Sequence, residues 1–388
     1  MAIFTLALNL PMWAAMSASA QRAQVSNLVA LPAESPVRAL AIPAAAVVVR
    51  DLSQEDHAAW DRFVFDHPDG SPFHLIAWKK SIEQTFDYRS MYLVARSGDQ
   101  IRGVLPLFLV NNFLTGKVLI SSPFAVYGGI LADSDKVRQA LCERAREIGE
   151  ELQVQHIEFR NGSENQCNDL LRIRRYVTFT QEIGPDESAL LAEIPRKTRR
   201  IVRRACQNDL VMQREFDRFD NFEDLYSKNL RRLGTPSFPR QHFANILENF
   251  RGMVDIREVL HQGTVTATVL TFYFRDRILP YYGASDATYK ALAPSTFMYY
   301  DLMRWGGRNG FRCFDFGRSK RVKGPYDFKS HWGMVESDLP YEVCLIKRKT
   351  MPNFSPSNPS FQLPIKCWRR LPLAVTRTLG PLLVRLVP

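Results

Sequence analysis

The chain has 388 residues, of which 46% are hydrophobic and 23% charged, a composition typical of a folded protein with more than one domain. Lys and Arg number 51 against 40 Asp and Glu, and the formal net charge of +11 favours anionic partners. The six cysteines form no C-x-x-C pair, so the sequence signals neither a disulfide framework nor a zinc site. No apolar run reaches the roughly 18 residues of a membrane-spanning helix.

The N-terminal segment is rich in Ala and Pro and has little periodic pattern, and we predict a poorly ordered extension over residues 1–45. Its opening, MAIFTLALNLPMWAAMSASAQ, has an apolar centre and an A-x-A-like end, as in a secretory signal peptide. It lacks the Lys or Arg expected near the start of such a peptide. We therefore prefer an extension read from an upstream start codon, with a signal peptide as the alternative.

The rest of the chain carries the same order of predicted elements twice. In the first half, two strands flank a turn in 91–110, a third lies in 118–130, an amphipathic helix covers 133–152 and a strand closes at 154–161. In the second half, the same order is found in the segments 254–276, 278–286, 293–310 and 311–319. The Tyr-Gly pairs at Tyr127 and Tyr282, and the closing-strand Phe159 and Phe316, keep nearly equal offsets.

Three strands, a helix and a closing strand, occurring twice, predict an α+β (α/β) fold of two tandem N-acetyltransferase-like (GNAT) domains. We expect mixed, mostly antiparallel sheets flanked by helices. The predicted division gives a first domain over 46–185, a second over 186–350 and a basic amphipathic tail over 351–388.

Two basic segments lie in the second half. The first, EIPRKTRRIVRRACQNDL, crowds six cations onto one helix-like stretch, which we interpret either as a solvated face or as an anion-binding face. The second, DFGRSKRVKGPYDFKSHWG, interleaves cations with aromatic rings, and its glycines let the backbone turn and approach a ligand. The Arg318 guanidinium there offers a planar fork for a phosphate or carboxylate.

These segments, with RRLGTP at 231–236 and SPFHLIAW at 71–78, resemble the FemAB-type acyltransferase family, most closely its members associated with exosortase/PEP-CTERM exopolysaccharide gene clusters. The resemblance covers residues 47–388. It implies two tandem N-acetyltransferase-like domains, a cytoplasmic location and transfer of an acyl or aminoacyl group to an amine. Lipid-linked or nucleotide-linked glycans are the acceptors that it implies.

The donor is left open between acyl-coenzyme A and aminoacyl-tRNA, and no tightly bound cofactor or metal is expected. The long helical pair of the family's tRNA-using members is missing, and neither half carries a Q/R-x-x-G-x-G/A pyrophosphate loop. The chain also has no G-x-S-x-G, H-E-x-x-H or G-x-x-x-x-G-K-[ST] motif, which argues against a serine hydrolase, a zinc protease and a P-loop nucleotidase. Acyl transfer to an amine needs positioning and a polarised carbonyl more than a covalent nucleophile.

We expect the site chiefly on the second domain. The predicted catalytic residues are Asp315 and Tyr282, although a structural role for Asp315 and core packing for Tyr282 are the alternatives. The predicted substrate-binding residues are Arg318, Ser319, Lys323, Tyr326, Lys329, Trp332, Tyr281, Arg199 and Arg203.

The favoured function is an acyltransferase acting on a cell-envelope or exopolysaccharide-related glycan or lipid-linked precursor. The alternatives are a nucleic-acid-binding protein that uses the first basic segment, and a non-catalytic scaffold. The tail IKCWRRLPLAVTRTLGPLLVRLVP alternates cations with apolar residues, and we expect Gly380-Pro381 to break it into two short pieces. Such a tail suits an anionic membrane at the inner face of the cytoplasmic membrane, and docking on the protein itself is the alternative.

Overall fold

The computed structural model describes residues 46–162, 167, 170–216, 219–321, 324–350, 359–386 and 388; the predicted N-terminal extension and Lys323 lie outside the described residues. In the first half the helices are α1 (His57–Asp66), α2 (Ile76–Phe86) and α3 (Asp135–Glu151). The strands there are β1 (Val48–Asp51), β2 (Arg89–Ser90), β3 (Leu93–Ser97), β4 (Gln100–Leu105), β5 (Phe108–Asn112), β6 (Gly116–Ile120), β7 (Leu131–Ala132), β8 (His156–Phe159) and β9 (Leu171–Glu182).

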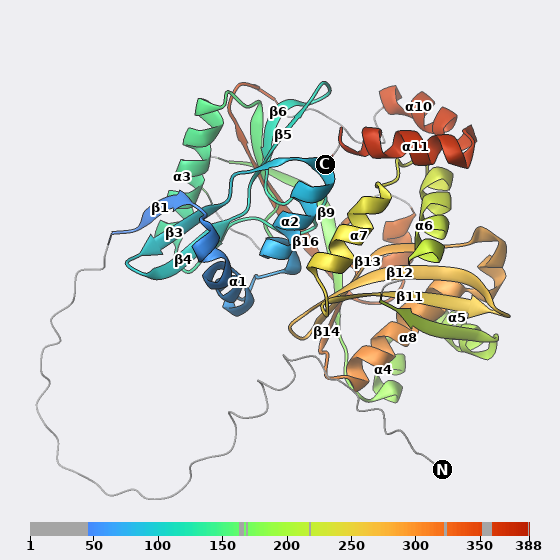
Figure 1. The fold of residues 1–388 in the computed structure, drawn as a ribbon. Coiled ribbons are helices and arrows are strands. Elements are labelled where there is room, and N and C mark those ends of the chain that lie inside the picture. Colours follow the sequence, from blue (N-terminus) through green and yellow to red (C-terminus); the bar gives the residue numbers. More distant parts are fainter. Residues whose placement is uncertain are drawn as a thin grey trace, which may run out of the picture. The chain divides into compact units, whose positions relative to one another are not determined.

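The second half contains longer strands and more helices (Figure 1). Its strands are β10 (Leu210–Glu215), β11 (Val254–His261), β12 (Thr264–Phe274), β13 (Arg277–Ser285), β14 (Cys313–Asp315), β15 (Ser319–Lys320) and β16 (Val335–Leu345). Its helices are α4 (Glu187–Glu193), α5 (Arg196–Gln207), α6 (Asp220–Leu233), α7 (Arg240–Asn249), α8 (Pro294–Arg308), α9 (Pro325–Ser330), α10 (Pro359–Arg370) and α11 (Leu373–Val384).

The predicted duplication is present in the strand pairing. In each half an antiparallel pair, β3 with β4 or β11 with β12, is followed by two parallel strands. The parallel pairs are β6 with β8 and β13 with β14, and the helix that precedes the second strand of each pair is α3 or α8. The predicted α+β class, two tandem units with mixed, mostly antiparallel sheets flanked by helices, is confirmed.

Strands β1, β3, β4 and β7 form a four-stranded sheet of their own, and a strand exchange joins the remaining strands of both halves into a second sheet. The strand order is β10-β11-β12-β13-β14-β9-β16-β8-β6-β5-β2, and β15 pairs with β9. Strand β9, from the first half of the chain, therefore lies between two strands of the second half, β14 and β16. Strand β16 in turn pairs with β8 of the first half. The predicted boundary at residue 185 stays a prediction, and hydrogen-bonded strands cross it in both directions.

Each helix packs through one apolar face, as its sequence spacing dictates. In α3 the buried residues Val137, Leu141, Ala145 and Ile148 recur every three or four positions, and the helix contacts β3 and β4. Helix α6 ends at Gly234, whose φ of 80° is the left-handed conformation that favours glycine at a helix end. That turn leads into the loop against which the C-terminal helices pack.

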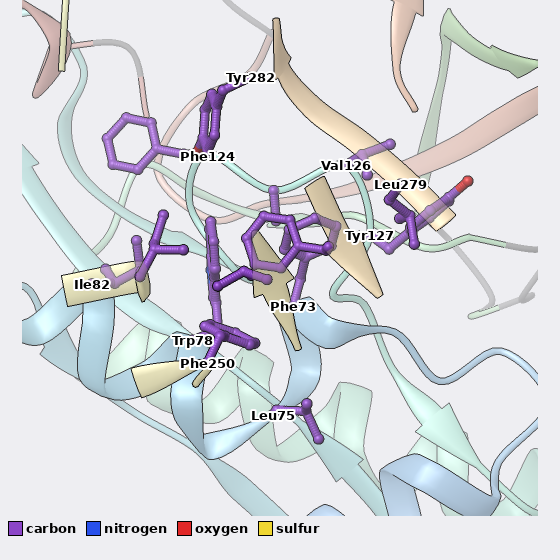
Figure 2. Close-up of a cluster of buried hydrophobic side chains, with 14 of the residues drawn as sticks. Phe73, Leu75, Trp78, Ile82, Phe124, Val126, Tyr127, Phe250, Leu279 and Tyr282 are labelled. Atoms are coloured by element: carbon purple, nitrogen blue, oxygen red, sulfur yellow. The ribbon is translucent and has the colours of Figure 1, made fainter. Parts of the chain in front are cut away.

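The largest buried cluster draws on both halves. Phe73 and Trp78 come from the segment before α2 and from α2 itself, while Phe250 and Tyr282 come from the second half. Trp78 and Phe250 meet edge to face with ring centroids 6.4 Å apart, and Figure 2 shows Phe73 and Phe124 in the same cluster. Packing of this kind makes the halves mutually dependent, because neither apolar face is covered without the other.

The C-terminal tail docks on the protein through α10 and α11, which contact α6. The Trp368 indole N–H donates to the carbonyl oxygen of Thr235 at 3.2 Å, and the Arg377 guanidinium donates to Asp224 at 2.6 Å. The expected break at Gly380-Pro381 is wrong: the helices separate between Arg370 and Leu373, and Gly380 lies buried inside α11. Among the described residues, no helix is long and apolar enough to cross a bilayer.

Candidate functional site

A basic cavity of about 420 Å³ lies where the two halves meet. Its walls come from β6, β8, β9 and β16 and from the segment that follows β14. We call it the basic cavity, and it is lined by Thr115, Val118, Ile120, His156, Glu158, Arg160, Ile173, Arg175, Tyr176, Arg318, Ser319, Lys320, Pro325, Tyr326, Tyr341, Leu386 and Pro388.

Positive charge exceeds negative charge in this lining. Arg160, Arg175, Arg318 and Lys320 face one side-chain carboxylate, Glu158, which accepts from the Arg160 guanidinium at 2.8 Å. Arg160 also donates to the main-chain oxygen of Pro388, the last residue of the sequence, at 2.7 Å. Within the described part of the chain, Arg175, Arg318 and Lys320 form no ion pair with a carboxylate. Cations held together without counter-charges repel one another, so this arrangement favours an anionic ligand.

Arg318 lies among aromatic rings. Its guanidinium carbon is 4.9 Å from the centre of the Tyr176 ring and 5.9 Å from that of Tyr341. The Tyr341 hydroxyl accepts from Arg318 only at the long distance of 3.5 Å. Stacked rings fix the plane of the guanidinium and leave most of its N–H groups free for a ligand.

Two buried polar atoms of the lining have no partner in the part of the chain that the structure describes. They are the Ser319 hydroxyl oxygen and Nδ1 of His156, and each residue is only 5% exposed. Buried polar atoms normally have a hydrogen-bond partner, and those without one call for an explanation. Burial lowers the pKa of His156 below its usual value, so its imidazole is neutral at neutral pH. A hydrogen bond to a ligand in the cavity would give either atom a partner.

Asp315 fixes the backbone that carries Arg318. Its buried carboxylate accepts from the hydroxyls of Tyr127 at 2.6 Å and Thr178 at 2.7 Å, and from Arg277 at 3.2 Å. It also accepts from the backbone N–H of Gly317 at 2.8 Å, where a φ of 63° turns the chain. The donors come from both halves of the chain, so Asp315 joins the halves beside the cavity.

Lys329 holds the same turn from the other side. Its ammonium group donates to the carbonyl oxygens of Phe316 at 2.6 Å, Gly317 at 3.2 Å and Arg318 at 3.4 Å. Burial lowers the pKa of Lys329 to about 8. Lys329 thus contacts the backbone that positions Arg318, and it does not line the basic cavity.

A second, apolar cavity of about 470 Å³ adjoins the first. Helices α6, α10 and α11, together with the loop that follows α6, form most of its walls, and we call it the apolar groove. Arg318, Lys320, Leu386 and Pro388 line both cavities. The rest of the groove is lined by Leu114, Phe124, Tyr226, Leu230, Leu233, Gly234, Thr235, Pro236, Phe238, Pro364, Ile365, Trp368, Leu383 and Val384.

The predicted site residues are divided among several places. Arg318, Ser319 and Tyr326 line the basic cavity, and the Tyr326 hydroxyl donates to Glu336 at 2.8 Å. Asp315 and Lys329 support the turn, as described above. Lys323 lies outside the described residues.

The remaining predicted residues line neither cavity. The Tyr281 hydroxyl donates to the carbonyl oxygen of Phe124 at 2.7 Å, and the Tyr282 hydroxyl bonds Nε2 of His242 at 3.0 Å. Trp332 is buried in the core around α8. Arg199 and Arg203 lie on α5, whose Thr198 hydroxyl donates to the carbonyl oxygen of His331 beyond α9. The catalytic role of Tyr282 and the substrate-binding roles of the other four residues stay predictions.

The sequence alone missed several lining residues. His156 and Glu158 belong to β8, the closing strand of the first half, and Arg160 directly follows it. Strand β8 is the counterpart of β14, the strand that leads to Arg318. That equivalence was visible in the repeat and points to a site shared by both copies. Arg175 carried no such signal, because only the pairing of β9 with β15 brings it beside Lys320.

Lys320 makes anion binding depend on pH. Burial lowers the pKa of Lys320 to about 8, with further lowering from Arg318 and Arg175. A phosphate ester is already mostly doubly charged above its second pKa of about 6. As the pH rises through about 8, Lys320 loses its proton, and we expect phosphate-ester affinity to fall about tenfold.

Isothermal titration calorimetry with a phosphate-ester probe at a series of pH values measures this dependence. Lys320→Met should bind more weakly at neutral pH and show no such fall. An unchanged pH profile in Lys320→Met would assign the titration to another group, of which Lys329, with its pKa of about 8, is the first to test.

Part of this chain is similar to a known protein family. Residues 190–330 match the family described as the acetyltransferase (GNAT) domain. No curated protein sequence matches the chain. The chain thus contains a region similar to GNAT acetyltransferases, and this region includes Asp315 and Arg318.

Solved structures extend the likeness over most of the chain. The crystal structure of FemX, 15% identical, covers 81% of this chain and 99% of its own, with a TM-score of 0.60. A tandem GNAT protein from the clavulanic acid biosynthesis pathway, 12% identical, covers 79% of this chain and 100% of its own at 0.48. The C-terminal domain of a putative lysylphosphatidylglycerol synthetase from Agrobacterium fabrum is 12% identical. The match covers 74% of this chain and 92% of that domain, with a TM-score of 0.49. At 15% identity, the similarity to FemX shows the fold alone.

Proposed function

We propose that this protein is an acyltransferase that moves an acyl or aminoacyl group to an amine on a phosphate-bearing glycan or lipid-linked precursor of the cell envelope. The observation that carries the proposal is the basic cavity, in which Arg175, Arg318 and Lys320 have no carboxylate partner among the described residues. The resemblance to FemAB-type proteins associated with PEP-CTERM exopolysaccharide clusters supports an exopolysaccharide-related acceptor.

The chemistry requires few groups. The acceptor amine attacks the acyl carbonyl, a C–N bond forms, and the C–S bond of a thioester or the C–O bond of an ester breaks. The departing thiol or hydroxyl leaves with the proton that the amine gives up. His156, whose neutral imidazole has no partner at Nδ1 among the described residues, is the lining residue suited to relay that proton. The phosphate bound at Arg318 supplies orientation, which alone lowers such barriers by many kcal/mol.

The donor is proposed as acyl-coenzyme A or aminoacyl-tRNA, and α5 favours a donor rich in phosphates. The helix carries six cations, and no described residue forms an ion pair with any of them. They are Arg196, Lys197, Arg199, Arg200, Arg203 and Arg204. The same helix is the observation that favours the rival function, a nucleic-acid-binding protein.

An Arg199→Ala/Arg203→Ala variant tests the role of α5. We expect it to weaken tRNA binding in a filter assay about tenfold at low salt, with a shallower dependence on salt, because two phosphate contacts are lost. Arg174→Ala/Arg232→Ala, with the same change in charge at exposed sites outside α5, is the control. Equal tRNA binding by the two double variants would show that α5 does not recognise the donor. It would also argue against a nucleic-acid-binding function for this helix.

We further propose a cytoplasmic protein that works at the inner face of the cytoplasmic membrane. The outer surface of α10 and α11 supports this, because Leu379 and Leu382 on α11 are 41% and 63% exposed and Lys366 and Arg370 on α10 are exposed as well. Apolar side chains flanked by cations suit an anionic bilayer surface. Flotation with anionic and with neutral vesicles measures the association.

The transferase activity is tested with purified protein, a panel of acyl-coenzyme A and aminoacyl-tRNA donors, and amine-bearing envelope precursors. We expect an acylated product of increased mass, together with release of free thiol or deacylated tRNA. His156→Ala should slow turnover while acceptor affinity stays near wild type. Failure of every donor with acceptors that do bind would favour the non-catalytic scaffold.

A further inference from the structure

The basic cavity and the apolar groove share a wall. Arg318 and Lys320, two cations of the segment after β14, line both, together with Leu386 and Pro388 beyond α11. The two cavities therefore adjoin at these two cations. A ligand that fills both must carry its negative charge directly next to its apolar part.

The two cavities differ sharply in chemistry. The basic cavity offers guanidinium, ammonium and hydroxyl donors, including the Ser319 hydroxyl that no described residue partners. The walls that belong to the groove alone come mainly from aliphatic and aromatic side chains, among them Leu230, Ile365 and Trp368. Water in such a groove makes few hydrogen bonds, so an apolar chain displaces it favourably.

We propose that the joined cavities bind a lipid phosphate, with the phosphate held by Arg318, Lys320 and Ser319 and the hydrocarbon chain lying in the apolar groove beneath α10 and α11. This rests on the proposed function and narrows its acceptor to a precursor linked to a membrane lipid through phosphate. The glycan then extends from the phosphate into the rest of the basic cavity, toward His156. Arg175 lines the same cavity and suits a second phosphate in a lipid diphosphate.

A long-chain acyl-coenzyme A fits this geometry less well. In that donor the pantetheine arm separates the acyl chain from the nearest phosphate, whereas Arg318 and Lys320 stand at the point where the groove begins. A lipid phosphate has no such spacer. In a lipid phosphate the hydrocarbon chain is attached directly to a phosphate oxygen. In this protein Arg318 and Lys320 likewise lie directly beside the apolar groove.

Calorimetric binding of alkyl phosphates of increasing chain length, below their micelle concentrations, tests the proposal. We expect affinity to rise by about fourfold for each buried methylene until the groove is filled. Inorganic phosphate, which reaches only the basic cavity, should bind far more weakly than decyl phosphate. A neutral decyl glycoside should lose at least about tenfold relative to decyl phosphate, because it lacks the charge.

Ile365→Trp, which narrows the groove, should abolish the dependence on chain length and leave inorganic phosphate binding unchanged. Leu363→Trp is the matched control, because Leu363 lies on the same helix, is 70% exposed and does not line the groove. Thermal melting of both variants checks that α10 stays docked. Equal chain-length dependence in the two variants would overturn the assignment of the chain to the groove.

The outcomes separate this inference from the proposed function. Acylation of a water-soluble phosphorylated glycan without chain-length-dependent binding overturns the lipid site and leaves the transferase. Chain-length-dependent binding without any transfer supports the lipid site and removes the transferase. If long-chain acyl-coenzyme A competes with decyl phosphate and binds more tightly, and Ile365→Trp weakens it equally, the groove belongs to the donor and the proposal fails.

Discussion

Arg318→Met is expected to weaken the binding of a phosphate-bearing acceptor about 100-fold, which corresponds to about 2.7 kcal/mol, and to abolish detectable transfer. Arg318 lines both cavities, lies over the Tyr176 ring and has no ion pair with a described carboxylate, so its donors are available to a ligand. The unfolding midpoint should change little, because Arg318 bonds only one described side chain, at 3.5 Å. Calorimetry with decyl phosphate and turnover with a glycan acceptor measure the two effects.

Two variants sharpen this result. Arg318→Lys keeps the charge and loses the planar fork, so we expect an intermediate affinity. Arg174→Met removes a cation one residue from Arg175 on β9 that lines neither cavity, and its binding should equal that of the wild type. Wild-type affinity in Arg318→Met would show that the basic cavity is not the acceptor site.

Asp315→Ala is expected to lower the free energy of unfolding by about 3 kcal/mol or more. The substitution removes the acceptor of four hydrogen bonds and leaves the Tyr127 and Thr178 hydroxyls and the Arg277 guanidinium without it. Tyr127→Phe removes one of these donors and should cost about 1 kcal/mol. Urea denaturation followed by tryptophan fluorescence measures both changes.

Further variants distinguish the structural role of Asp315 from its predicted catalytic role. Asp276→Ala, an exposed aspartate next to Arg277 in sequence, is the stability control and should stay within about 0.5 kcal/mol of the wild type. If Asp315→Asn folds with near wild-type stability and still loses all turnover, the catalytic prediction gains support. A stable Asp315→Ala would contradict the view that this carboxylate joins the halves.

The sequence predicted the fold class because its signals were local and occurred twice. The turn between β3 and β4 and the apolar spacing of α3 are properties of neighbouring residues. The nearly equal offsets of the Tyr127–Tyr282 and Phe159–Phe316 pairs link the two copies. Arg318 and Ser319 were predicted for a similar reason, since glycine and clustered cations mark a turn near a ligand.

The rest of the site depends on long-range pairing. His156 and Arg175 reach the basic cavity only because β16 pairs with β8 and β15 pairs with β9. No local pattern encodes such an exchange. The positive charge of Lys329 predicts contact with a ligand, whereas its ammonium group donates to backbone carbonyl oxygens. This contact depends on the three-dimensional course of the turn. The predicted helix break at Gly380-Pro381 is wrong because Gly380 lies within α11 and packs closely on Ser237. The sequence does not show this contact.

The exchange of β9 and β16 has a consequence for how the chain acquires its structure. Strand β8 gains its second neighbour, β16, only when residues up to 345 are present, long after the first half has been synthesised. Until then β8 is an exposed sheet edge, which readily pairs with other chains. Pairings across such sequence separations also slow folding, because the loop must close before the contacts form. A nascent first half should therefore depend on chaperones until the last strand arrives, and separately expressed halves should aggregate unless they are synthesised together.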